Sequence, residues 1–328
     1  MRIIFLGSSH FALPALRATL DCAYDIPAVI TQPDRRKGRG LKISASPVKN
    51  EGLKKGLFIY QPEDINNRDF VEQLARLEPE ILLSAGYGQK ISSELLTLAP
   101  QGVWNIHPSL LPKYRGAAPV VWAILNGEKK TGVSIFRMVE RMDAGDIIAQ
   151  EETEINEKET AGELEIRLSE IGARLLVKAL RKLEAEQISF TPQDDSKATF
   201  APRLKKADGL IDWNKSALEV VNQVRAMNPW PGAYTYLETS EVRGRASSER
   251  LGIWRAALGE KIPTGQEKEL RGGQAGAVLA AEEAGITVSC GSGAVVLKEI
   301  QPSSARRMTT ADYIHGHKIR PGDRFGRR

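Results

Sequence analysis

The sequence has few cysteines and few histidines, and these shortages exclude several kinds of protein. It contains 2 Cys and 4 His in 328 residues. Cys22 and Cys290 lie far apart in the chain, so they fit neither a disulfide framework nor a zinc site. His315 and His317 come nearest to a metal motif, but no carboxylate stands at ligand spacing from them. We therefore expect no bound metal and a reducing, cytoplasmic environment.

Long apolar runs and a nucleotide-binding glycine motif are also missing. The longest apolar stretches are well short of the roughly 20 residues that a membrane helix needs, so we expect no membrane partner. The first run, residues 3–6, is too short for a signal peptide and indicates a buried strand. Gly7 is the single glycine in the turn that follows, where a dinucleotide fold carries three. This absence argues against a nucleotide-dependent oxidoreductase.

Short apolar runs alternate with segments of helical periodicity. Leu13, Leu16 and Leu20 show the helical spacing in the first intervening segment, and a long helix is expected over residues 160–183. The expected strands cover residues 3–6, 27–31, 57–60, 80–84, 101–106, 132–138 and 147–152. Strand alternating with helix predicts an α/β fold with a doubly wound, mainly parallel sheet that helices cover on both faces.

A polar, proline-punctuated segment divides the chain. It covers residues 188–207, and we interpret it as a linker between a first domain, 1–187, and a second domain, 208–328. The second domain has one expected helix, near residues 216–227, followed by short apolar runs separated by glycine. Short strands at regular spacing predict a small β-barrel.

The excess of basic residues lies in the second part of the chain. Net charge is +5, and residues 205–328 hold 19 Lys+Arg against 14 Asp+Glu, whereas the two signs balance before them. Such a distribution suits a polyanionic partner, although basic faces in contact with water are common.

A second basic cluster follows the second expected strand. Residues 34–55 contain 8 Lys+Arg against 2 Asp+Glu, and Gly38 and Gly40 disfavour a helix there. A basic loop of this kind can bind the phosphates of RNA, but a solvated loop explains the pattern equally well. The candidate RNA contacts are Arg35, Arg36, Lys37, Arg39 and Lys42.

The polar residues with the clearest chemistry follow the fifth expected strand. Asn105 and His107 are two residues apart, so strand alternation points both side chains the same way. They lie at the carboxyl end of the strand, where open α/β sheets bind ligands. An amide and an imidazole can together donate to an oxygen that gains charge during acyl transfer. No nucleophilic Ser or Cys motif lies nearby, which favours direct attack by the acceptor; alternatively, the pair only satisfies backbone groups in a turn.

Prolines give the next segment a fixed shape. Pro108 and Pro112 fix φ and remove backbone donors. Ser109, Leu110, Leu111 and Pro112 are therefore expected to form a rigid, non-helical wall beside the polar pair. A flat, largely apolar ligand could lie along this wall, so we predict that these four residues bind the cofactor.

Two long motifs resemble the signature of the folate-dependent formyltransferases, namely N-I-H-P-S-L-L-P-K-Y-R-G-A-A-P at 105–119 and S-I-F-R-M-V-E-R-M-D-A-G-D-I at 134–147. The similarity extends from residue 3 to residue 325. It implies a Rossmann-like formyltransferase domain, an OB-like second domain that binds tRNA, and 10-formyltetrahydrofolate as the formyl donor. In the family pattern the first loop carboxylate is catalytic. The resemblance therefore assigns Asp143 to the site, where it would orient His107 and stabilise its charged form, whereas Asp146 caps the turn.

The resemblance also gives the basic cluster a role. Members of the family that act on tRNA have a basic insertion here, and those that act on small molecules do not. We therefore expect a monomeric, cytoplasmic enzyme that transfers the formyl group to the free amino group of initiator methionyl-tRNA. Two alternatives stay open: a formyltransferase for a small amine, such as an amino sugar or glycinamide ribonucleotide, and a non-catalytic RNA-binding protein.

Overall fold

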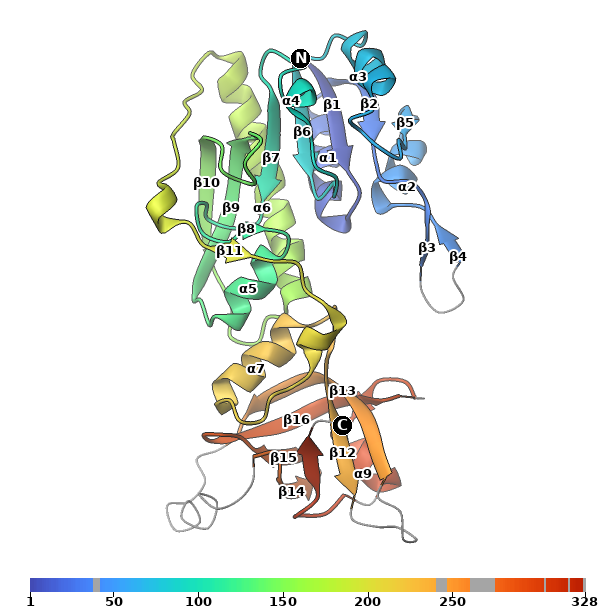
Figure 1. Ribbon diagram of the computed structural model, residues 1–328, viewed down its shortest axis with the longest axis vertical. Coiled ribbons are helices and arrows are strands. Elements are labelled where there is room, and N and C mark those ends of the chain that lie inside the picture. The colour runs from blue at the N-terminus through green and yellow to red at the C-terminus, as the bar shows by residue number, and fades with distance from the viewer. Residues whose placement is uncertain (38–41, 240–246, 260–274, 304, 318, 327–328) are drawn as a thin grey trace. The chain divides into compact units, whose positions relative to one another are not determined.

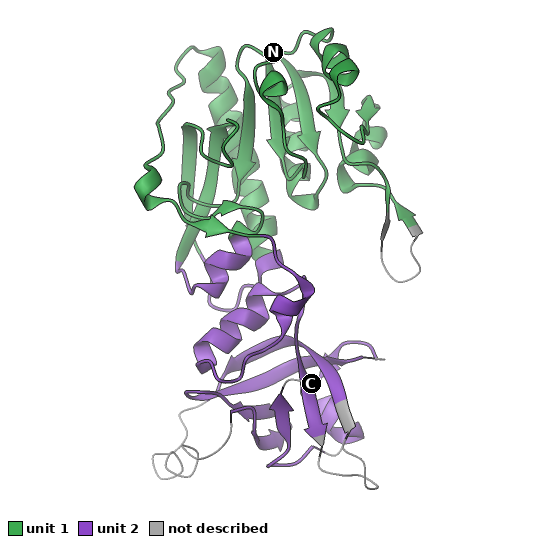
Figure 2. Cartoon of the chain, in the orientation of Figure 1, with its two compact units in different colours: residues 1–119, 130–154, 163–202 green, residues 120–129, 155–162, 203–328 purple. Residues whose placement is uncertain are grey.

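The computed structural model describes residues 1–37, 42–239, 247–259, 275–303, 305–317 and 319–326. It divides the chain into two compact units (Figure 2). Unit 1 contains residues 1–119, 130–154 and 163–202, and unit 2 contains residues 120–129, 155–162 and 203–328. Residues 188–202, which the sequence analysis assigned to a linker, therefore pack with unit 1.

Unit 1 is built on a mainly parallel sheet, which confirms the predicted fold class (Figure 1). The strand order is β10-β9-β7-β6-β1-β2-β5; β9 pairs antiparallel with β7, and β10 pairs antiparallel with β9. The strands of this sheet are β1 (Arg2–Gly7), β2 (Asp25–Ile30), β5 (Ile59–Tyr60), β6 (Ile81–Ala85), β7 (Val103–His107), β9 (Lys130–Arg137) and β10 (Ile147–Glu154). Two small sheets join β3 (Arg35–Lys37) with β4 (Lys42–Ser44), and β8 (Arg115–Gly116) with β11 (Phe200–Ala201).

Helices cover both faces of this sheet. On one face, Val71 of α3 belongs to the same buried cluster as Leu82 of β6 and Val103 of β7. On the other face lies α6, because a side chain on its Gly172 would meet Ile106, which points away from Val103 along β7. The helices of unit 1 are α1 (Leu13–Asp21), α2 (Pro47–Lys54), α3 (Arg68–Ala75), α4 (Ser93–Leu96) and most of α6 (Ala161–Glu184), with the short 3-10 helices η1 (His10–Ala12) and η2 (Asp195–Lys197).

Polar side chains start several of these helices. Ser46, Asn67 and Ser92 each accept a hydrogen bond from the backbone amide three residues later, at the first turns of α2, α3 and α4. Such a cap satisfies an amide that has no partner within the helix.

Strand β6 is buried along its whole length, as expected for a strand inside a parallel sheet.

Unit 2 contains a curled antiparallel half-barrel, which corresponds to the predicted small barrel. The strand order is β14-β15-β16-β13-β12-β18, with β17 against β16, and a bridge between Ala277 and Arg324 links its two ends. The strands are β12 (Ala233–Thr239), β13 (Ser247–Leu258), β14 (Val278–Glu282), β15 (Gly285–Ser289), β16 (Ala294–Pro302), β17 (Met308–Thr309) and β18 (Arg324–Gly326). The helices are α5 (Pro119–Leu125), η3 (Lys206–Gly209), α7 (Ala217–Ala226) and α9 (Thr310–Gly316).

Candidate active site

Strand β7 ends in the two polar residues that the sequence analysis singled out. Asn105 and His107 share the sheet face of Val103, because alternate residues of a strand point the same way. Asn105 is half-buried, and its backbone lies opposite Ser84 of β6 and Phe136 of β9 in the sheet. Its side-chain amide has no hydrogen-bond partner among the described residues. The amide is therefore available to a ligand.

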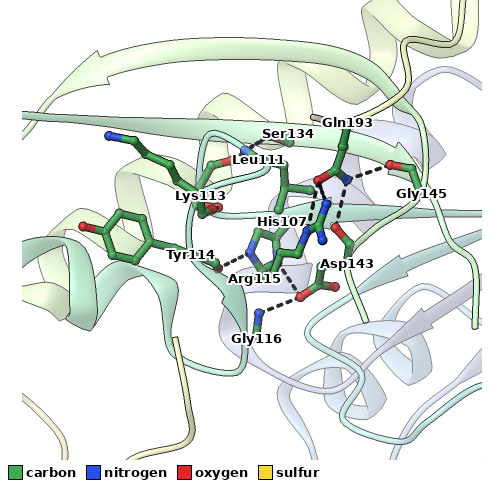
Figure 3. Close-up of polar contacts among 11 residues, drawn as sticks. His107, Leu111, Lys113, Tyr114, Arg115, Gly116, Ser134, Asp143, Gly145 and Gln193 are labelled. Atoms are coloured by element: carbon green, nitrogen blue, oxygen red, sulfur yellow. Dashed lines mark hydrogen bonds and ion pairs between the residues drawn. The ribbon is translucent and has the colours of Figure 1, made fainter. Parts of the chain in front are cut away.

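The His107 ring is held from two sides (Figure 3). Its Nε2 lies 2.9 Å from the carbonyl oxygen of Tyr114. Because a carbonyl oxygen only accepts, this contact keeps a proton on Nε2. Its Nδ1 lies 3.7 Å from Oδ2 of Asp143, and the ring packs edge-on against Phe136. The side chain is nearly fully buried. Because Nε2 keeps its proton on the Tyr114 carbonyl, Nδ1, which lies beside the carboxylate, is the nitrogen that can exchange a proton.

Asp143 reaches this imidazole from the loop between β9 and β10. Its φ is 49°, in the left-handed region, and its Oδ2 accepts a 2.8 Å hydrogen bond from the backbone amide of Gly116. Asp146 instead forms an ion pair with Arg137 at 3.2 Å. Of the two loop carboxylates, the structure therefore brings Asp143 to His107 and leaves Asp146 outside the site.

Gln193, which the sequence analysis did not select, holds the Asp143 loop (Figure 3). Its Nε2 donates to the carbonyl oxygens of Asp143 at 2.8 Å and Gly145 at 2.7 Å. Its Oε1 accepts from Nε and Nη2 of Arg115 at 3.1 and 2.7 Å. The residue was missed because a glutamine in a polar, proline-punctuated segment has the sequence pattern of a solvated linker.

Arg115 connects this amide to a carboxylate. It is 3% exposed, and its Nη2 also donates to Oδ1 of Asp195 at 2.8 Å. Arg141 binds the other oxygen of Asp195 at 2.6 Å. Hydrogen bonds from Arg115 and then Arg141 lower the pKa of Asp195 from its ordinary value. Arg115 lies inside the first formyltransferase motif, which was the one signal in the sequence that it belongs to the site.

The predicted wall, Ser109 to Pro112, is a fixed segment beside the pair. Ser109 and Leu111 are buried, whereas Leu110 and Pro112 are half-buried. Ser134 ties the segment down, because its hydroxyl donates to the Ser109 carbonyl at 2.7 Å and accepts from the Leu111 amide at 3.0 Å. Leu110 and Pro112 are therefore the members of the wall with surface left for a ligand.

Four of the five predicted RNA contacts, Arg35, Arg36, Lys37 and Lys42, lie on a β-hairpin. Its strands β3 and β4 pair antiparallel, although these short basic runs show no alternation that would have predicted strands. Arg35 is exposed. Arg39 lies outside the described residues, as do the side chains of Arg36, Lys37 and Lys42.

Two kinds of feature are absent from the described parts of the chain. No group of three or more His, Cys, Asp or Glu side chains there is arranged to hold a metal ion. Nor does that part of the structure include a helix long and apolar enough to cross a membrane.

Two stretches of the sequence match known protein families. Residues 1–180 match the family model described as formyl transferase, and residues 203–318 match the one described as formyl transferase, C-terminal domain. The chain therefore belongs to the formyltransferase family. Its full-length relatives include proteins named methionyl-tRNA formyltransferase: the one from Ruminiclostridium cellulolyticum is 40% identical over 100% of both chains, and the one from Solibacter usitatus is 42% identical over 99% of both.

Solved structures share the fold at low sequence identity. The N-formyltransferase from Helicobacter canadensis, in complex with folinic acid and dTDP-3-aminofucose, has a TM-score of 0.64 at 18% identity and covers 92% of this chain and 98% of its own. HypX from Aquifex aeolicus, in complex with tetrahydrofolic acid, has a TM-score of 0.59 at 19% identity and covers 98% of this chain and 50% of its own.

Gly145→Ala is expected to damage both stability and activity. A Cβ at this position would collide with the carbonyl oxygen of Arg137, so the backbone of the loop has to move. We expect the free energy of unfolding to fall by about 1 to 3 kcal/mol, as for other overpacked sites. The rate of formyl transfer should fall as well, because Asp143 is two residues away.

Urea titration and steady-state kinetics measure the two effects. Gly316→Ala is the matched control, because a Cβ there meets open space. If Gly145→Ala were as stable and as active as Gly316→Ala, the loop would not be tightly held.

Proposed function

We propose that the chain transfers the formyl group of 10-formyltetrahydrofolate to the amino group of initiator methionyl-tRNA. The main support is the full-length similarity to relatives named for this activity. The relative from Ruminiclostridium cellulolyticum, for example, is 40% identical over 100% of the chain. The availability of the Asn105 amide next to the His107 and Asp143 pair adds chemical support.

The acceptor in this proposal is an ordinary α-amino group. Such a group titrates at roughly pH 7.7 to 8.0 in peptides, so its neutral form is accessible without a strong base. The amine nitrogen forms a bond to the formyl carbon, and the bond from that carbon to the folate nitrogen breaks. The proton that the amine loses ends on the departing folate nitrogen.

Asn105, His107 and Asp143 have separate roles in this reaction. The Asn105 amide donates to the formyl oxygen as that oxygen gains negative charge. His107, whose Nε2 is bound to the Tyr114 carbonyl, uses Nδ1 to carry the proton between the two nitrogens. Asp143, at 3.7 Å from Nδ1, stabilises the protonated ring while it holds that proton.

We propose that the wall binds the folate. Leu110 and Pro112, the half-buried members, contact the flat ring system. Ser109 and Leu111 are buried and act by fixing the backbone beneath it. These residues fit a folate because they combine apolar surface with a backbone that Ser134 holds in place through two hydrogen bonds.

We also propose a division of labour between domains. Unit 1, which includes residues 188–202 of the expected linker, carries the chemistry, and residues 208–328 bind tRNA through their basic excess. Because aminoacylated tRNA is used by ribosomes, we propose that the protein acts in the cytoplasm. We also propose that it acts as a monomer.

Loss of charge from the hairpin segment should weaken the tRNA interaction. For the double variant Arg39→Ala/Lys42→Ala we expect a higher KM for methionyl-tRNA and a kcat close to that of the wild type. The slope of log KM against log salt should flatten by about 0.7 to 0.9 for each phosphate that the variant no longer binds. Initial rates at several salt concentrations give both quantities.

The matched control removes two exposed charges from α6, as Arg181→Ala/Lys182→Ala. It should leave the KM unchanged. A hairpin variant with the salt dependence of the wild type would show that Arg39 and Lys42 do not contact RNA.

The proposed function is tested by the identity of the acceptor. Conversion of 10-formyltetrahydrofolate is followed in the ultraviolet with initiator methionyl-tRNA, elongator methionyl-tRNA or a dTDP-linked amino sugar as the acceptor. We expect rapid conversion with the initiator species. Conversion with the amino sugar alone would favour the small-amine alternative, and no conversion with any acceptor would favour a non-catalytic RNA-binding protein.

A further inference from the structure

We propose that residues 193–201, at the end of unit 1 that leads into unit 2, position the catalytic pair, and that Gln193 is the main positioning residue of this segment. The inference rests on the proposed function, because it assigns Asp143 and His107 their roles in formyl transfer. It goes beyond that function because it adds to the active site a segment that the sequence analysis treated as a linker.

Gln193 uses the full hydrogen-bonding capacity of its side-chain amide. Its amide has two N–H donors and an oxygen with two lone pairs, and the structure fills all four: two bonds to the carbonyls of Asp143 and Gly145, and two from Arg115. Both acceptors belong to the loop that carries the catalytic carboxylate. Asp143 has a φ of 49°, a left-handed conformation that is unfavourable for a residue with a side chain, and these hydrogen bonds help to hold it.

The same segment also fixes the other partner of the carboxylate. Gly116, whose amide donates to Asp143, lies in β8, which pairs with β11. Gly116 has a φ of +125°, and a Cβ there would lie 2.6 Å from the carbonyl oxygen of Ala201. The amide of Ala118 donates to that oxygen at 3.2 Å. Asp143 is therefore held by Gln193 through its backbone and by Ala201 through the partner of its side chain.

A third contact reaches His107. Thr199 Oγ1 accepts a 2.9 Å hydrogen bond from the amide of Tyr114, and the carbonyl of Tyr114 is the acceptor for Nε2 of His107. Tyr114 has a φ of 62°, so its peptide orientation also depends on its surroundings. One short segment thus restrains both members of the pair whose Nδ1 to Oδ2 distance is 3.7 Å.

The ion pairs behind Gln193 anchor the segment. Arg115 is buried and shares its donors between Gln193 and Asp195, and Arg141 binds the second oxygen of Asp195. Without Asp195 or Gln193, the guanidinium would be buried with unsatisfied donors, which is unfavourable. The anchor therefore favours the conformation in which the Gln193 amide faces the loop.

Gln193→Leu removes all four hydrogen bonds while nearly keeping the side-chain volume. Because small misplacements of catalytic groups cost up to about 100-fold in rate, we expect kcat to fall by about 10- to 100-fold. The KM values for donor and tRNA should change by less than about 3-fold, since the missing hydrogen bonds position groups that act in the transition state rather than in substrate binding. Gln193→Glu should also be impaired, because it keeps the acceptors for Arg115 but turns an oxygen toward the two carbonyls.

Gln223→Leu is the matched control. Gln223 is also a buried amide whose Nε2 donates to two backbone carbonyls, those of Asp208 at 3.1 Å and Leu210 at 2.9 Å, but it lies in unit 2. Its replacement should lower the melting temperature and leave kcat unchanged. If Gln193→Leu does not fold, Thr199→Val tests the same inference, because it removes only the acceptor for the Tyr114 amide and should lower kcat several-fold.

A double-mutant cycle with Asp143→Ala separates positioning from general stabilisation. If Gln193 acts through Asp143, adding Gln193→Leu to Asp143→Ala should cost less than about 2-fold further in kcat, because the two changes are coupled. The inference is overturned by a kcat near that of the wild type in Gln193→Leu, by equal losses in both backgrounds, or by an equal loss of kcat in Gln223→Leu. Absence of transfer to methionyl-tRNA by the wild type would instead contradict the proposed function.

Discussion

Asn105→Ala is expected to lower kcat by about 100- to 1000-fold, the usual cost of removing one donor to a developing oxyanion. The KM for 10-formyltetrahydrofolate should stay nearly unchanged, because the amide contributes most when the formyl oxygen gains charge. The structure supports a large effect, since this amide has no competing partner among the described residues. Steady-state kinetics with saturating methionyl-tRNA measure it.

Asn105→Asp is the companion variant. It keeps the size of the side chain but replaces its donor with a negatively charged oxygen, so its kcat should be at least as low as that of Asn105→Ala. Nearly normal turnover in either variant would remove Asn105 from the mechanism.

His107→Asn is expected to lower kcat by about 100- to 10,000-fold, the range for general acid and base groups. The change removes Nδ1, the ring nitrogen that lies 3.7 Å from Asp143. It leaves a side-chain amide of smaller reach, which cannot carry a proton from the amine to the departing nitrogen. Single-turnover kinetics with both substrates bound isolate this step from binding and product release.

His315→Asn provides the control for loss of an imidazole, because His315 is exposed on α9. It should leave the single-turnover rate unchanged. A rate for His107→Asn within about 3-fold of this control would be too fast for loss of a proton-transferring group.

The buried strands could be predicted from the sequence because burial leaves a continuous apolar run. The runs at 80–84 and 101–106 correspond to β6 (Ile81–Ala85), which is buried along its length, and to β7 (Val103–His107), which is buried except at Asn105. The short runs separated by glycine in the second domain include those that form β15 (Gly285–Ser289) and β16 (Ala294–Pro302). The common face of Asn105 and His107 followed from the strand period alone.

Other parts of the site could not be predicted because their interactions have no period. Gln193 and Thr199 reach the site through hydrogen bonds to backbone atoms about 50 to 85 positions away in sequence. A side chain with such partners looks the same in the sequence as a solvated one. Asp143 required the family motif, since its left-handed φ of 49° has no signature in an Asp followed by Ala.

Asn105 and His107 are proposed to assist direct transfer of the formyl group from the folate to the amine of methionyl-tRNA, and every other role assigned to the site depends on this step. It is tested by single-turnover transfer of a labelled formyl group from 10-formyltetrahydrofolate to initiator methionyl-tRNA by the wild type, Asn105→Ala and His107→Asn. We expect labelled N-formylmethionyl-tRNA with the wild type, and at least about 100-fold slower transfer with each variant at full binding of both substrates. Label on the methionine at the wild-type rate in both variants would contradict this mechanism.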